Sequence, residues 1–167
     1  QTLLSRVFGA VIDGDESLSA ARRLENPNLY VTGQAEQIGS LTAKRLVFAD
    51  GARAEINAVN ADKLPITGAA ELALSGTEIE TVVIDTDQDV TLRGDSETKI
   101  GEVLIRRGGS VALEGSMALG VVHVQGAARK LTVRATCTIQ NETKSAITVA
   151  DPDGEERSIG PGTDDVL

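Results

Sequence analysis

One short pattern recurs along the chain and constrains its fold more than any other feature. Each unit reads apolar, any residue, apolar, any residue, small, an alternation that is typical of a β-strand with one buried face. The units are LYVTG, AEINA, LALSG, VTLRG, VALEG and LTVRA, and they begin at residues 29, 54, 72, 90, 111 and 131. The last four intervals are 18, 18, 21 and 20 residues. This near-constant spacing indicates a structural repeat.

A second apolar pair precedes each later unit by eight or nine residues, so each repeat holds two strands. The pairs are Leu46/Phe48, Leu64/Ile66, Val82/Ile84, Val103/Ile105 and Val122/Val124. One coil cannot bury its own apolar row, but stacked coils share a continuous column. Aromatic residues make up only 2% of the chain, which fits a narrow aliphatic core. The sequence therefore predicts an all-β fold, a single-stranded-coil β-solenoid (β-helix) with about 18–21 residues per coil.

The alternative fold is an antiparallel sandwich or barrel, which also contains short strands separated by turns. Hairpins of a sandwich rarely keep one inward pattern in phase over five units, so the solenoid is favoured. Glycine follows the second strand of three repeats, at Gly76, Gly94 and Gly115. Glycine permits the positive φ that a corner often needs.

The two ends depart from the repeat. Residues 1–28 are predicted to form an N-terminal cap, with a helix over 15–25 (DESLSAARRLE) that stops before Asn-Pro. Residues 29–140 are predicted to form the coils. Residues 141–167 are predicted to form a β-hairpin, turning at Asp151–Gly154 and followed by the loose tail TDDVL. The hairpin would serve either as a cap or as a docking edge for another domain.

The charge of the chain disfavours two classes of partner. The net charge is −9, whereas nucleic-acid binding needs clustered Lys and Arg. An anionic membrane surface is disfavoured for the same reason. No apolar run reaches transmembrane length, so membrane insertion is not expected. Gln1 begins no signal-peptide pattern, although a mature chain with its signal removed would look the same.

Catalytic chemistry finds little support in the residues. The single histidine, His123, lies between Val122 and Val124, and the alternation places it on the outer face. No Ser/His/Asp or Cys/His set can be assembled around it, so the chain is predicted not to be an enzyme. The single cysteine, Cys137, is predicted to be a small buried hydrophobe.

The strongest candidate for a metal site is DTDQD at residues 85–89. Asp85, Asp87 and Asp89 alternate, so an extended backbone would place all three carboxylates on one side. Ca²⁺ prefers several oxygen ligands, mostly carboxylates and carbonyls. The segment also lies on the turn between two strands, where a solvated run of charge is common. Calcium is therefore the only candidate cofactor, and no other is expected.

Two further motifs bear on adhesion and modification. Arg93-Gly94-Asp95 spells RGD, a tripeptide that integrins recognise, at a corner of the repeat. Asn141-Glu142-Thr143 is a sequon for N-glycosylation, which has meaning only in a eukaryotic secretory pathway.

The later repeats resemble the β-solenoid repeats of secreted bacterial (Firmicutes-type) surface proteins. KIGEVLIRRGGSVALEGSMALGVVHVQGAARKLTV carries the likeness, and SAITVADPDGEERSIGPG is similar to their terminal hairpins. The likeness covers residues 38–162. It implies a non-catalytic structural, assembly or adhesion module, extracellular or at the cell surface. Its partners would be copies of itself, end to end in filaments, or neighbouring domains.

A shorter stretch has a different likeness. GSLTAKRLVFADGARAEINA, at residues 39–58, resembles bactofilins, which implies a cytoskeletal polymer subunit. A calcium- or glycan-binding module is the alternative from a different functional class. It depends on the face that carries Asp85, Asp87 and Asp89.

Overall fold

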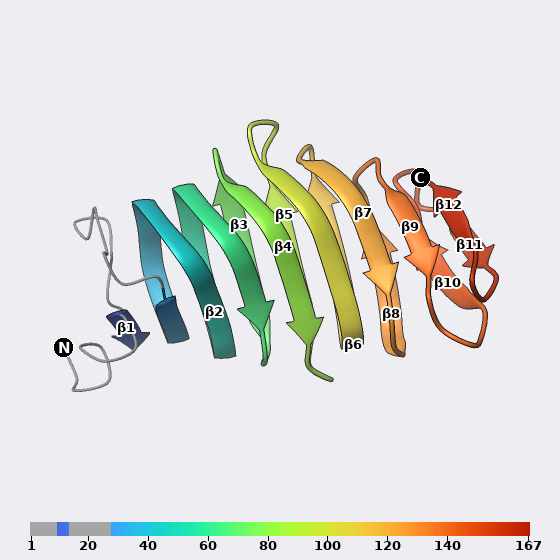
Figure 1. The fold of residues 1–167 in the computed structure, drawn as a ribbon, viewed down its shortest axis with the longest axis horizontal. Helices are drawn as coiled ribbons and strands as arrows, with labels where there is room; N and C mark the ends of the chain where they lie inside the picture. The colour runs from blue at the N-terminus through green and yellow to red at the C-terminus, as the bar shows by residue number, and fades with distance from the viewer. Residues whose placement is uncertain (1–9, 14–27) are drawn as a thin grey trace.

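The computed structural model describes residues 10–13 and 28–167, and within these residues the fold is all-β with no helix (Figure 1). The strands are β1 (Ala10–Asp13), β2 (Asn28–Ile66), β3 (Ala70–Ser75), β4 (Glu78–Asp85), β5 (Val90–Gly94), β6 (Lys99–Gly115), β7 (Ala118–Val124), β8 (Ala128–Val133), β9 (Thr138–Asn141), β10 (Ile147–Ala150), β11 (Glu156–Ile159) and β12 (Asp164–Val166). The predicted helix over 15–25 lies outside the described residues.

Successive coils stack as parallel strands, side by side along the long axis of the molecule (Figure 1). β4 lies between β2 and β6, and β5 lies between β3 and β6. Asn60, Glu78, Lys99 and Ala118 are consecutive partners in register, which gives coils of 18, 21 and 19 residues. The predicted solenoid is thereby confirmed. The parallel pairing excludes the antiparallel sandwich.

The core is a set of aliphatic columns that run through the stack. Leu64, Val82, Val103 and Val122 are partners in register, and all four are fully buried. The neighbouring column is also buried and consists of Ile66, Ile84, Ile105 and Val124. Burying one such side chain stabilises the fold by about 1.5–3 kcal/mol. The inward pairs expected at these positions are therefore confirmed.

The glycine corners have two different physical causes. Gly115 has a φ of +96°, a left-handed conformation that favours glycine. Gly94 has no positive φ, but a Cβ there would lie 2.7 Å from the Cβ and the sulfur of Met117. Gly94 is therefore required by close packing, and the expectation of positive φ holds for Gly76 and Gly115.

The C-terminal end closes the stack with antiparallel strands. β10 continues the coils by pairing parallel with β8, and β11 then returns antiparallel to β10. Asp151 shapes the intervening turn because its Oδ1 accepts hydrogen bonds from the amides of Asp153 (3.0 Å) and Glu155 (2.9 Å). The predicted hairpin is confirmed. The prediction of a loose tail is wrong, because Asp164–Val166 forms β12 and pairs antiparallel with β9.

At the other end, part of the predicted N-terminal cap is a strand. β1 pairs parallel with β2, and Ala10 is the partner of Leu29. This spacing of 19 residues matches the coils, so β1 adds to the stack. The remaining residues of the predicted cap, 1–9 and 14–27, lie outside the described part.

Candidate functional site

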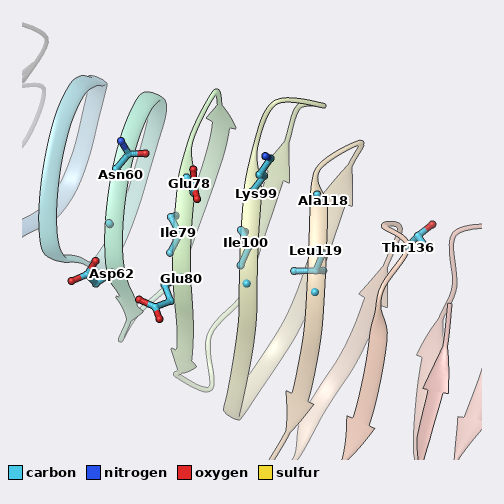
Figure 2. Close-up of a pocket in the computed structure, with 13 residues that line it drawn as sticks. Asn60, Asp62, Glu78, Ile79, Glu80, Lys99, Ile100, Ala118, Leu119 and Thr136 are labelled. Atoms are coloured by element: carbon cyan, nitrogen blue, oxygen red, sulfur yellow. The ribbon is translucent and has the colours of Figure 1, made fainter.

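A groove of about 890 Å³ crosses the coils and is the candidate functional site (Figure 2). Its residues form three rows along the long axis, each coil contributing one residue to a row. The first row is Asn60, Glu78, Lys99 and Ala118; the second is Ala61, Ile79, Ile100 and Leu119; the third is Asp62, Glu80, Gly101 and Gly120. Thr136, from the next coil, lines the far end of the groove. Strands β2, β4, β6 and β7 supply all of these except Thr136, which lies between β8 and β9.

The groove arises where the chain turns a corner within one strand. In β4, Ile79 and Val82 both point into the core, and two residues between them face outward. The sequence pattern apolar-x-x-apolar marks this corner in each coil. The middle row is therefore the buried floor, and the rows on either side are its exposed walls.

In the later coils, one wall of the groove consists of backbone without side chains. A Cβ on Gly101 would lie 2.7 Å from the carbonyl oxygen of Glu80. A Cβ on Gly120 would lie 2.2 Å from the carbonyl oxygen of Gly101. No side chain fits at either glycine unless the backbone moves, so main-chain atoms form the surface of this wall.

Charge is distributed unevenly along the groove. Asp62, Glu78 and Glu80 are exposed at the end nearest β2, and Lys99 is the single basic residue of the lining. None of these four forms a salt bridge with another side chain that the structure describes. The end near Thr136 carries no charged residue. The groove is thus acidic at one end and neutral at the other.

The aspartates predicted to bind calcium do not form a shared ligand set. Asp85 Oδ1 accepts a hydrogen bond from Arg107 Nε at 2.7 Å, and Asp89 Oδ1 accepts one from Arg129 at 2.8 Å. Asp87 is exposed. Among the side chains that the structure describes, no three His, Cys, Asp or Glu are grouped so that they could hold a metal ion.

The physical reason is the local backbone. The prediction assumed an extended segment, but β4 ends at Asp85 and residues 86–89 form the connection to β5. Thr86 is buried, and its Oγ1 accepts a hydrogen bond from the Gln88 amide at 3.1 Å, which closes a local bend over residues 86–88. Alternation ends at Gln88, which is exposed between the exposed Asp87 and Asp89, so the extended arrangement that the prediction assumed is not formed.

His123 belongs to a polar cluster on the outer face that sequence reasoning missed. Its Nδ1 lies 2.8 Å from Glu142 Oε1, and its Nε2 lies 3.4 Å from Glu102 Oε2. Hydrogen bonds from His123 and Gln125 lower the pKa of Glu142 below its ordinary 4.5. The outward direction of His123 is confirmed because Val122 and Val124 are buried. The three side chains of the cluster come from three different coils and are far apart in the sequence.

Residues of the RGD motif and of the sequon form hydrogen bonds within the fold. Asp95 Oδ1 accepts hydrogen bonds from the Gly76 amide (3.2 Å) and the Thr98 hydroxyl (2.9 Å). Desolvation acts to raise the pKa of Asp95, but these and other hydrogen bonds lower it below its ordinary 3.8. Asn141 is buried, and its Nδ2 donates to the carbonyl oxygens of Ser145 and Ile159. A glycan on Asn141 is incompatible with these contacts.

Comparison with known proteins returned no match to any family model, curated protein or solved structure. A helix long and apolar enough to cross a membrane is absent from the described residues. Function is therefore inferred from the coils, the closed end and the groove.

Proposed function

We propose that this chain is a non-catalytic structural module of a bacterial surface protein, a short rod that spaces neighbouring domains and displays its groove. The observation that carries the proposal is the closure of the last coil. A further coil would have to pair with β9 and β10, but β12 and β11 already pair with them in the antiparallel direction. A stack closed in this way has a defined length at its C-terminal end.

The packing supports a stiff rod. Parallel ladders join each coil to the next from β2 to β9, and the aliphatic columns continue through the same coils. Bending would open ladders and core contacts together. The resemblance of the repeats to surface solenoids supports the location, which is extracellular or at the cell surface.

End-to-end assembly into filaments, as a bactofilin-like subunit would form, is the competing version of the proposal. Such growth needs unpaired strand edges at both ends of the stack. The antiparallel strands β11 and β12 favour the finite rod, because they occupy the C-terminal edges.

Negative-stain electron microscopy of the purified chain over a concentration series tests the proposal. We expect isolated short rods at every concentration, and the same rods with calcium or with chelator. Filaments that lengthen with concentration would contradict the finite rod and favour the polymer subunit. Filaments that require calcium would additionally contradict the assignment of Asp85 and Asp89 to arginine pairs.

The location needs its own test, in the organism that makes the protein. Brief protease treatment of intact cells should release peptides from this chain, while a cytosolic marker protein stays intact. Peptides that appear only after lysis would contradict a surface location.

A further inference from the structure

We propose that the groove binds a polypeptide segment in extended conformation, with lysine or arginine side chains over its acidic end. This goes beyond the proposed function, because it names a partner class for the groove. It does not depend on where the protein is located. Length, charge and surface shape support it separately.

The length of the groove suits an extended chain. The lining spans five coils, from Asn60 to Thr136, and neighbouring strands lie about 4.8 Å apart. Four such steps span about 19 Å, which equals about six residues at roughly 3.3 Å each. A segment lying along the rows would therefore contact every coil of the groove.

The charge of the groove selects a basic segment. Asp62, Glu78 and Glu80 outnumber Lys99, and none of the four is paired with a described side chain. Complementary charge speeds encounter and discriminates between partners. A second copy of this chain is disfavoured as the occupant because each copy carries a net charge of −9. Exposed pairs are screened by salt, so binding should weaken as ionic strength rises.

The surface of the groove suits a peptide backbone. Gly101 and Gly120 expose main chain without side chains, so another backbone can approach closely. The small Ala118 keeps the neutral end open on the opposite wall. The described lining contains no aromatic ring on which a sugar would stack, which favours a peptide over a glycan.

Fluorescence anisotropy with two labelled peptides tests the inference on the full chain. The cationic probe is Lys-Ala-Arg-Ala-Gly-Ala, and the neutral probe carries Gln in place of Lys and Arg. We expect the cationic probe to bind at least tenfold more tightly at low salt. Equal affinities, or no binding of either probe, would overturn the proposal.

Three variants separate the groove from the general charge of the protein. Glu80→Lys should weaken binding of the cationic probe at least fivefold. Glu155→Lys makes the same charge change at an exposed position in the hairpin turn, and it should change affinity less than twofold. Ala118→Leu obstructs the groove without altering charge and should weaken binding at least threefold.

Equal losses in Glu80→Lys and Glu155→Lys would overturn the proposal, since attraction would then be non-specific. Circular dichroism and thermal unfolding check that each variant is folded, and Glu80→Gln replaces Glu80→Lys if that variant is not. The rod images and this assay are independent, so either hypothesis can fail without the other.

Discussion

At the scale of single residues, the corners show how strongly local geometry restricts the sequence. Ala58 has a φ of +52°, and Gly76, one coil later at the equivalent corner, has the same value. A left-handed conformation costs a residue with a side chain about 1–2 kcal/mol. Glycine avoids this cost but loses more conformational freedom on folding.

Ala58→Gly should therefore raise the free energy of unfolding, by about 0.5–1 kcal/mol. Chemical denaturation followed by circular dichroism measures the change. Ala73→Gly is the matched control, because Ala73 lies exposed within β3, where glycine should lower stability by about 0.5–1 kcal/mol. A loss of stability in both variants would show that the corner is not strained by alanine.

Also at the scale of single residues, Cys137 shows how burial changes the reactivity of a side chain. Its side chain is buried, and burial raises the pKa of the thiol to about 11. Only the thiolate reacts with alkylating reagents, so roughly a thousandth of the thiol is reactive at pH 8. We expect iodoacetamide to modify Cys137 at pH 8 only after denaturation, as read by mass spectrometry.

An exposed thiol provides the comparison for Cys137. Ser116→Cys at an exposed corner should be alkylated rapidly in the native protein. Equal rates at the two cysteines in the folded state would contradict the burial of Cys137.

At the scale of elements, the β10–β11 hairpin depends on one buried carboxylate. Asp151 Oδ2 accepts a hydrogen bond from Arg157 Nε at 2.8 Å, while its Oδ1 holds the turn amides. Desolvation acts to raise the pKa of Asp151, but Arg157 and the turn amides lower it below its ordinary 3.8. A carboxyl group whose pKa is lower in the folded chain than in the unfolded chain stabilises the fold when the pH is above its unfolded-state pKa. This stabilisation is lost as the pH falls through the pKa of the folded state.

Asp151→Asn should therefore lower the melting temperature at pH 7, and the difference from the native chain should shrink as the pH falls below 3.8. Thermal unfolding from pH 7 to pH 2 measures both effects. Asp153→Asn, at an exposed position in the same turn, should change the melting temperature little. A constant difference at all pH values would contradict the role of the Asp151 carboxylate.

The strands that form the coils were predictable because their signal is local. Val82 and Ile84 alternate with outward residues, and the same pattern returns in the neighbouring coils. β12 gave no such signal, since Asp164–Val166 is short and pairs with β9 through backbone hydrogen bonds. The turn after Asp85 was one of the two interpretations of DTDQD, because the segment separates two alternating runs, but its backbone conformation was not predictable from the alternation.

The candidate site was less predictable than the coils for a related reason. Glu80, Gly101 and Gly120 each occupy an ordinary outward position in the sequence. They form one wall only because the coils bring residues about 20 positions apart into a row. The spacing of the apolar pairs gives the coil lengths, but it does not show which of the outward positions line a hollow on the surface.

At the scale of the whole molecule, pairing of the C-terminal strands decides whether copies of the chain can associate end to end. β12 covers the outer edge of β9, and an uncovered strand edge is a template for pairing with another chain. Removal of residues 163–167 should therefore cause self-association, seen as a sedimentation coefficient that rises with concentration. The full chain measured at the same concentrations is the control.

Circular dichroism of the truncated chain should retain the β-sheet spectrum. A truncated chain that keeps its β-structure and stays monomeric at all concentrations would show that β12 is not needed to block association.

The register between coils also determines how such a molecule can change in length. Duplication of one whole coil, such as residues 78–98, would extend the rod by about 4.8 Å and leave its cross-section unchanged. The groove would gain one further step. Insertion of one residue within a strand would instead exchange inward and outward side chains and disrupt the core. The length of such a stack can therefore change only by whole coils, and related proteins of different length should differ by complete coils.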